Sequence, residues 1–311
     1  LYGSLLVAAC ASSGTGYVDI NGETGWHRQM IDEHDATARM SGSILVPSSG
    51  FDSIPSDLGT QWVASLMAER YGQPTRRVSC FAAVNGAFSG GTVASGILGD
   101  ETFGPEYLAN PFLLGGSPSP VASADEHADP IVAAFDADIN SHVAPFGMAS
   151  INTRIVRRSV ALLGGAPSLF TPDFCYREVA VAPTEAVAVK MARAAAAPVE
   201  KRKELVAKGR LPMPGQGPDE ATRSKSWFKF TFIAESADGS MKLAGTCSGG
   251  DPGYDETAKM VSEAAVCLAT QDKPPTSHGG FMTPATALGP SLREQLHAEG
   301  ILFQEVPLPS L

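Results

Sequence analysis

Two carboxylates stand close together in a loop between a short apolar run and a helical pattern. The loop carries Asp52 and Asp57, with Gly50 shortly before them. A carboxyl group can donate or accept a proton in a reaction when burial brings its pKa toward neutrality. A glycine in such a loop lets the backbone approach a ligand closely. We therefore take Asp52 as the best candidate for a catalytic residue and the loop as a candidate binding site.

The segments around this loop predict a strand, a loop and a helix. Residues 44–46 form an apolar run, ILV, long enough for a buried strand and too short for a helix. Ser56 or Asp57 can cap a helix whose apolar face includes Leu58 and Trp62. Open α/β sheets bind ligands beyond the carboxyl ends of their strands, where this loop lies. The alternative that needs no ligand is an Asx-turn followed by a helix cap.

A second set of polar residues follows another predicted strand. Asp19, Asn21 and Glu23 come at or just after the strand predicted at residues 17–20. They can lie near the same cleft. Equally, they can solvate the loop and cap the helix predicted at residues 26–39.

A third candidate is the small-residue stretch Ser89, Gly90, Gly91 and Thr92. It resembles a turn that cradles phosphate at a helix N-terminus, although it lacks the lysine of a P-loop and the Rossmann spacing. We expect it to lie on the substrate side of the cleft. The glycine-rich residues 249–254 are better explained as a tight turn.

The remaining pattern divides the chain into two kinds of structure. The first 60 residues predict the end of a parallel, doubly wound α/β sheet. Residues 76–84 predict a strand that begins a second domain. Alternating residues at 227–233 and 241–248, on either side of an Ala-Asp-Gly turn, predict a β-hairpin. Residues 184–208 predict one long helix, because they are rich in Ala and Lys.

The candidate loop also resembles a known signature. Residues 48–59, SSGFDSIPSDLG, are similar to the signature of the saccharopine dehydrogenase-like oxidoreductases, a group that includes the bacterial trans-acting enoyl reductases. Four further stretches fit the same family: 17–23 (YVDINGE), 89–96 (SGGTVASG), 211–232 and 279–303.

The resemblance implies a fold and an activity. The fold is an α/β remnant of a Rossmann-like doubly wound parallel sheet, with a second α+β domain containing a mixed or antiparallel sheet. We expect residues 1–60 in the first domain, 61–278 in the second, and 279–311 as a helix and strand that return to the first. The implied activity is NAD(P)-dependent hydride transfer, including enoyl reduction in lipid, glycolipid or polyketide metabolism.

The resemblance also implies site residues. In related enzymes a Gly-Phe/Leu-Asp-Pro loop lies beside the nicotinamide, and Ser53 stands here where that proline would follow. The implied cofactor-binding residues are Tyr2, Gly3, Ser49, Gly50, Phe51 and Asp52. The implied substrate-binding residues are Asp19, Glu23, Ser53, Asp57, Ser89, Gly90, Gly91 and Thr92.

The start of the chain carries a further expectation. It begins at Leu1 and contains no glycine-rich dinucleotide-binding turn. The resemblance implies that about three βα units, of roughly 30 residues each, are missing before it. Tyr2 and Gly3 would be the remnant of a GPYxxYG-like run. We therefore expect NAD(P)(H) to bind only when that N-terminal part is present.

Composition excludes several classes of function. The net charge of −10 argues against nucleic acid and against simple adhesion to anionic lipid. The most apolar long stretch, residues 179–198, is interrupted by charges and does not predict a membrane span. Five dispersed cysteines are typical of reduced thiols in an intracellular, cytoplasmic protein.

We expect no metal site. His27 and His34 lie seven residues apart on one predicted helix face, and acidic residues surround His34 and His127. We interpret all three as parts of solvated acidic faces. The expected partner is a lipid-like acyl chain or another small-molecule substrate. Homodimerisation and association with a lipid droplet or membrane periphery stay open.

The alternative function is a non-catalytic scaffold on a lipid droplet or membrane surface. Eukaryotic members of the family are associated with such surfaces and carry an apolar segment in the second domain. In this chain residues 184–209, with Lys201, Arg202 and Lys203, stand in its place.

Overall fold

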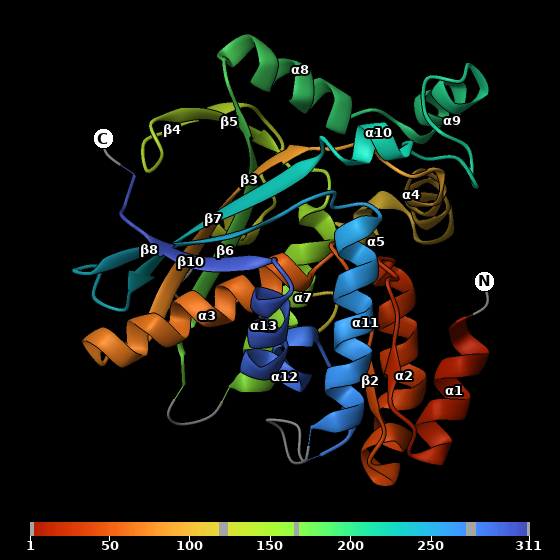
Figure 1. Ribbon diagram of the computed structural model, residues 1–311, viewed down its shortest axis with the longest axis vertical. Coiled ribbons are helices and arrows are strands. Elements are labelled where there is room, and N and C mark those ends of the chain that lie inside the picture. Colours follow the sequence, from red (N-terminus) through yellow and green to blue (C-terminus); the bar gives the residue numbers. More distant parts are fainter. Residues whose placement is uncertain (1–2, 118–123, 165–167, 272–277, 310–311) are drawn as a thin grey trace.

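The chain folds into two sheets with helices packed around them. A computed structural model describes residues 3–117, 124–164, 168–271 and 278–309. One sheet has three strands in the order β1-β2-β9, and the other has seven in the order β10-β8-β7-β3-β6-β5-β4 (Figure 1). The predicted α/β class, with a parallel sheet and a second, mixed sheet, is confirmed.

The three-stranded sheet is parallel throughout. Its strands are β1 (Tyr17–Val18), β2 (Ile44–Val46) and β9 (Gly280–Phe281). Helix α1 (Gly3–Ser13) precedes β1, and α2 (Thr24–Ser41) connects β1 to β2. Helix α2 ends at Gly42, whose left-handed backbone (φ 79°) turns the chain into β2. Strand β1 is shorter than predicted, so Asp19 and Ile20 belong to the loop after it.

The seven-stranded sheet has two long parallel strands at its centre, β3 (Thr75–Asn85) and β6 (Phe170–Ala182). The predicted hairpin is present as β7 (Trp227–Ser236) and β8 (Lys242–Gly249), which pair antiparallel. The other strands are β4 (Ala134–Asp136), β5 (Ser141–Pro145) and β10 (Leu302–Val306).

The main core lies between one face of this sheet and a group of helices. Phe228, Phe230 and Phe232 alternate along β7 and are fully buried on that face. They face α3 (Ile54–Tyr71), where Gly59 allows the closest approach: a Cβ there would lie 2.3 Å from Phe232 Cζ. The helices on this side also include α7 (Ala149–Leu163), α11 (Asp255–Thr270), α12 (Pro284–Ala287) and α13 (Gly289–Ala298).

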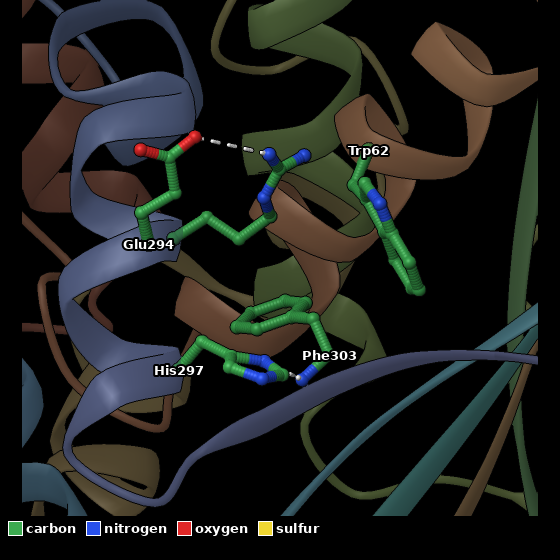
Figure 2. Close-up of a pocket in the computed structure, with 5 residues that line it drawn as sticks. Trp62, Glu294, His297 and Phe303 are labelled. Atoms are coloured by element: carbon green, nitrogen blue, oxygen red, sulfur yellow. Dashed lines mark hydrogen bonds and ion pairs between the residues drawn. The ribbon is translucent and has the colours of Figure 1, made fainter.

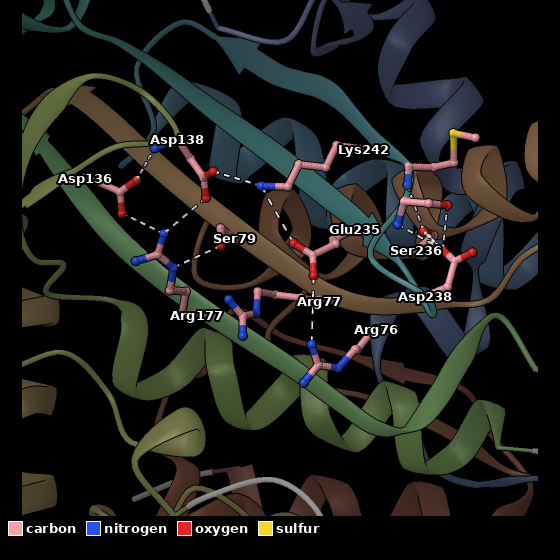
Figure 3. Close-up of polar contacts among 12 residues, drawn as sticks. Arg76, Arg77, Ser79, Asp136, Asp138, Arg177, Glu235, Ser236, Asp238 and Lys242 are labelled. Carbon is pink, nitrogen blue, oxygen red and sulfur yellow. Dashed lines mark hydrogen bonds and ion pairs between the residues drawn. The ribbon is translucent and has the colours of Figure 1, made fainter. Parts of the chain in front are cut away.

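The opposite face of the sheet is polar at one end. Arg177 donates to Ser79 Oγ at 2.9 Å and to Asp136 Oδ2 at 2.6 Å, and Lys242 pairs with Asp138 at 3.0 Å (Figure 3). The Lys242–Asp138 pair is exposed and contributes little to stability individually, whereas Asp136 is buried beneath Arg177. These charged side chains bond to one another across neighbouring strands, so this face does not resemble a reaction centre.

The long helix predicted at residues 184–208 is wrong. The segment forms two helices, α8 (Glu185–Ala195) and α9 (Val199–Ala207), with Pro198 at the start of the second. Proline has no N–H to donate and its ring displaces the preceding turn, so one continuous helix is disfavoured. The remaining helices are α4 (Gly90–Phe103) and the short α5 (Pro105–Leu108), α6 (Ala124–His127) and α10 (Glu220–Arg223).

The C-terminal segment contributes to both sheets. Strand β9 pairs with β2 in the small sheet, whereas β10 pairs with β8 at the edge of the large one. The segment therefore links the two sheets, and the predicted domain boundaries stay a prediction.

Candidate active site

The loops after β1 and β2 are bonded to each other at the carboxyl edge of the parallel sheet. The backbone nitrogen of Ser49 donates to Asp19 O at 2.7 Å, and Ser48 Oγ donates to Asn21 O at 2.7 Å. Ser48 has a left-handed backbone (φ 55°), which is uncommon for a residue other than glycine. The candidate residues around Asp52 and those around Asp19 therefore lie together.

Asp52 lies at the centre of this edge and is partly exposed. Its carboxylate is close to Gly22, since a Cβ built on that glycine would lie 3.4 Å from Asp52 Oδ2 and 3.0 Å from Ile151 Cδ1. Within the described ranges no protein group donates a hydrogen bond to the Asp52 carboxylate. Desolvation, and then the negative charge of Asp19, raise the pKa of Asp52 to about 7.

Asp19 is held differently from Asp52. Its Oδ2 accepts a hydrogen bond of 2.6 Å from Tyr17 Oη, and its Oδ1 accepts one of 2.9 Å from the backbone nitrogen of Asn21. Desolvation raises the pKa of Asp19, but these donors oppose that shift because they stabilise the ionised form. The two neighbouring carboxyls thus differ in their hydrogen bonds, and the proton is more easily kept on Asp52.

Glu23 lies at the entrance of α2. Its backbone nitrogen donates to Asn21 Oδ1 at 2.7 Å, which is the geometry of an Asx-turn. Glu23 is partly buried and precedes Thr24, the first residue of the helix. The backbone of Asp19, Asn21 and Glu23 therefore forms a loop that leads into α2, as the interpretation without a ligand predicts. The side chains of Asp19 and Glu23 lie at the edge of the sheet.

Asp57 does not share this edge with Asp52. Its carboxylate is buried: Oδ1 accepts from Ser159 Oγ, and Oδ2 accepts from the backbone nitrogen of Ala285 at 2.8 Å. These bonds connect α3 with α7 and α12. Both carboxylate oxygens are therefore engaged within the protein.

Ser49, Gly50 and Phe51 are buried and anchor the loop. Ser49 Oγ donates to Val46 O at 2.9 Å. A Cβ on Gly50 would lie 3.0 Å from Thr257 Cγ2, so the close approach at this glycine is to α11. The nitrogen of Phe51 donates to Thr257 Oγ1 at 3.1 Å, and its ring packs edge-on against Phe228 with centroids 5.0 Å apart.

The stretch from Ser89 to Thr92 forms the start of α4. Ser89 caps the helix by accepting from the nitrogen of Thr92 at 3.1 Å. Gly90 is required by packing, since a Cβ there would lie 1.7 Å from Met213 O, and its nitrogen donates to Gln216 O at 2.9 Å. In the described residues no hydrogen bond joins this stretch to Asp52. The structure explains Gly90 without a phosphate, and a Cβ on Gly91 would make an ordinary contact of 3.6 Å with Ser89 Oγ.

Two of the implied cofactor-binding residues are at the start of the chain. Gly3 begins α1 and packs against Trp26: a Cβ added to Gly3 would lie 2.9 Å from Trp26 Cζ2. Tyr2 lies outside the described residues.

Three arginines on α7 are buried, which the sequence did not predict: Arg154, Arg157 and Arg158. They donate to backbone carbonyls in the connection that follows α4: Arg154 bonds Ala109 O at 2.9 Å, and Arg158 bonds Leu114 O at 2.6 Å. Arg158 also bonds Phe281 O in β9. Arg157 bonds His127 O at 2.8 Å. The sequence shows these residues on one helix but gives no sign of burial, because arginine is usually exposed.

The histidine prediction is wrong for two of three residues. His27 is fully buried beside the rings of Trp26 and Phe281, and His127 is buried against Phe112. Burial lowers the pKa of His27 to about 3, so its ring is neutral. Across the described ranges, no group of three or more His, Cys, Asp or Glu side chains is arranged to hold a metal ion.

A pocket of about 250 Å³ lies elsewhere, between α3, α13 and β10. Trp62, Arg293, Glu294, His297 and Phe303 line it (Figure 2). It contains none of the candidate residues and is separate from the Asp52 edge. Among the residues that the structure describes, no helix combines the length and the apolar character needed to cross a membrane.

Comparisons with known proteins give the family. No family model matches the chain. A Mycobacterium tuberculosis protein, whose name marks its assignment as a trans-acting enoyl reductase as provisional, is 31% identical over 336 residues, covering 99% of this chain and 78% of the relative. The chain belongs to the family of the trans-acting enoyl reductases. This confirms the resemblance drawn from residues 48–59 and places the chain among oxidoreductases.

Other members are similar over the same extent. The trans-acting enoyl reductase of Mycobacterium leprae is 28% identical over 332 residues, covering 97% of this chain and 77% of the relative. That of Mycobacterium ulcerans is 29% identical over 340 residues, covering 99% and 78%. Among solved structures, apo saccharopine dehydrogenase (L-Glu forming) from Saccharomyces cerevisiae aligns with a TM-score of 0.42 at 10% identity, covering 98% of this chain and 82% of that one.

Proposed function

We propose that the protein is an NAD(P)-dependent oxidoreductase that reduces the C=C bond of an enoyl group on a lipid-like acyl chain, in lipid, glycolipid or polyketide metabolism. Family membership supports the reaction class, because the relatives are named trans-acting enoyl reductases. The observation that supports the site is the Asp52 carboxyl, which has no hydrogen-bond donor in the described protein and a pKa raised to about 7.

The residues around Asp52 fit the nicotinamide end of the cofactor. They lie at the carboxyl edge of a parallel sheet, where α/β proteins bind nucleotides. Ile20 is 50% exposed beside this edge and offers an apolar surface for the nicotinamide ring. Ser49, Gly50 and Phe51 hold this edge in place, and Gly3 lies at an α1 N-terminus of the kind that favours phosphate. When bound, NAD(P)H supplies the hydride.

Asp52 supplies the proton in this proposal. Reduction of an enoyl group adds a hydride to one carbon and a proton to its neighbour, so a proton donor is needed. A carboxyl with a pKa near 7 is protonated in about half of the molecules at neutral pH and transfers its proton readily. Burial, and then the neighbouring Asp19 carboxylate, keep the pKa of Asp52 high, and partial exposure lets Asp52 regain a proton from water.

The test is turnover by the full-length protein. NADH and NADPH are each supplied with trans-2-enoyl thioesters of increasing chain length, and cofactor oxidation and the saturated product are measured. We expect product to form in step with cofactor oxidation, with Asp32→Asn, an exposed carboxylate on α2, behaving as wild type. Binding of acyl chains without any cofactor oxidation would contradict the proposal and favour the scaffold alternative.

A further inference from the structure

A row of buried hydrogen bonds connects the Asp52 loop with the large sheet. Ser53 Oγ lies 3.1 Å from Asn152 Oδ1 on α7, and Asn152 Nδ2 donates to Glu178 Oε1 on β6 at 2.6 Å. The other oxygen of Glu178 accepts from Tyr176 Oη at 2.5 Å. Ser53, Asn152 and Glu178 are fully buried, and Tyr176 is 1% exposed. The row therefore runs through the interior from the candidate site to the sheet.

Ser53 takes part in this row instead of capping its helix. It stands at the N-cap of α3, where a serine side chain ordinarily accepts from a backbone nitrogen of the first turn. Here it makes no such bond, and its hydroxyl is directed at Asp52 O, 2.6 Å away, and at Asn152. A cap of this type stabilises the first turn of a helix, so the local arrangement gives up helix stability while fixing the Asp52 peptide.

Glu178 is a costly residue for a purely structural role. In the described part of the chain no cationic side chain pairs with it, and burial raises its pKa. A buried carboxyl of this kind stabilises a fold less than apolar residues of similar volume would. What it does supply is a fixed acceptor for Asn152 Nδ2. That bond orients the amide so that Oδ1 faces Ser53.

The same turn of α7 also reaches the other side of Asp52. Ile151 precedes Asn152 and approaches Gly22, where a Cβ would lie 3.0 Å from Ile151 Cδ1 and 3.4 Å from Asp52 Oδ2. Asn152 therefore contacts the Asp52 peptide through Ser53, and its neighbour Ile151 lies beside the Asp52 carboxylate at Gly22. Packed helices hold such positions to a fraction of an ångström.

We propose that Asn152 is the positioning residue of this site: held by Glu178, it fixes through Ser53 the peptide that carries the Asp52 carboxyl. The inference rests on the proposed role of Asp52 as proton donor. It assigns a function to two buried polar residues, Asn152 on α7 and Glu178 on β6.

The test replaces Asn152 with leucine, which has a similar volume and forms no hydrogen bond. Because a catalytic group displaced by about 1 Å can lose on the order of 100-fold in rate, we expect kcat of Asn152→Leu to fall by roughly that factor while KM for the cofactor is unchanged. The pKa of Asp52, read from the pH profile and from carboxyl ¹³C NMR shifts, should move away from about 7. Glu178→Gln keeps an oxygen that accepts from Asn152 Nδ2, while its amide nitrogen can donate to Tyr176 Oη, so it should retain near wild-type kcat. Glu178→Leu should behave like Asn152→Leu.

Ser159→Ala is the matched control. Ser159 lies seven residues from Asn152 on the same face of α7 and is equally buried, but it bonds Asp57 and Thr283. It should lose stability and keep the wild-type kcat and pH profile. If Asn152→Leu fails to fold, Ser53→Ala tests the same connection. Wild-type kcat and an unchanged Asp52 pKa in the folded variant would overturn the positioning role. Full activity in Asp52→Asn would instead contradict the proposed function itself.

Discussion

Asp57 and Ala285 lie 228 positions apart in the chain, yet the backbone nitrogen of Ala285 donates a 2.8 Å hydrogen bond to Asp57 Oδ2. Ser159 donates to the other oxygen, so one buried carboxylate connects α3, α7 and α12. This connection lies beneath the candidate site, because α3 begins directly after the Asp52 loop. The environment of Asp57 therefore affects the stability of the elements that position the site.

Stability should fall as the pH rises through neutrality. Burial raises the pKa of both Asp52 and Asp57 from 3.8 to about 7. Between these values the folded protein binds more protons than the unfolded chain, so the free energy of unfolding decreases with increasing pH. Asp57→Asn removes one of the two groups while an amide can still meet Ser159 and Ala285, and it should flatten this decrease. Urea unfolding between pH 5 and about 8 measures it.

Asp32→Asn serves as the control for this experiment, since the Asp32 side chain is 65% exposed and forms a surface ion pair with Arg28. It should leave the pH dependence unchanged. A slope in Asp57→Asn equal to that of wild type would show that Asp57 has an ordinary pKa in the folded protein.

Gly59 should tolerate no side chain. A Cβ there would lie 2.3 Å from Phe232 Cζ, so Gly59→Ala forces α3 away from β7 and should destabilise the protein by about 1–3 kcal/mol or more. Gly99 is the matched comparison on α4, because a Cβ there meets nothing within 4 Å. Gly99→Ala should stabilise by up to about 1 kcal/mol through helix propensity. Thermal unfolding compares the two, and equal effects would contradict the packing described for α3.

Arg158 should not be replaceable by lysine. Its guanidinium bonds Leu114 O and Phe281 O together, and one ammonium group cannot reproduce that fork. Arg158→Lys should cost about 1–3 kcal/mol, since a buried carbonyl is left without a donor. It should also speed hydrogen exchange in residues 110–117. Arg28→Lys changes a surface pair and should stay within about 0.5 kcal/mol; matching losses in both variants would count against the role of Arg158.

Local signals in the sequence were sufficient for the strands and loops of the site. Residues 44–46 and the polar loop after them predict the edge where Asp52 lies, because strand, loop and helix follow directly in the chain. The β7–β8 hairpin was also predictable, since alternation and an Ala-Asp-Gly turn are local features. The break at Pro198 is a local signal as well, and it outweighs the helix-forming composition of the residues around it.

Long-range contacts could not be predicted in this way. Asp57 looks like Asp52 in the sequence, and only its bonds to Ser159 and Ala285 distinguish the two. Gly90 looks like part of a phosphate turn until the backbone of Met213 is seen to cross it. The burial of His27 likewise depends on Phe281, which lies far away in the chain.

The pH dependence of kcat/KM for enoyl reduction, compared between the full-length wild type and Asp52→Asn, tests the central claim most directly. Because the donor must be protonated, the wild-type rate should fall as the pH rises above an apparent pKa near 7. Asp52→Asn should lose on the order of 10²- to 10⁴-fold and lose that limb of the profile. A variant with the wild-type rate and the same profile would show that Asp52 is not the proton donor.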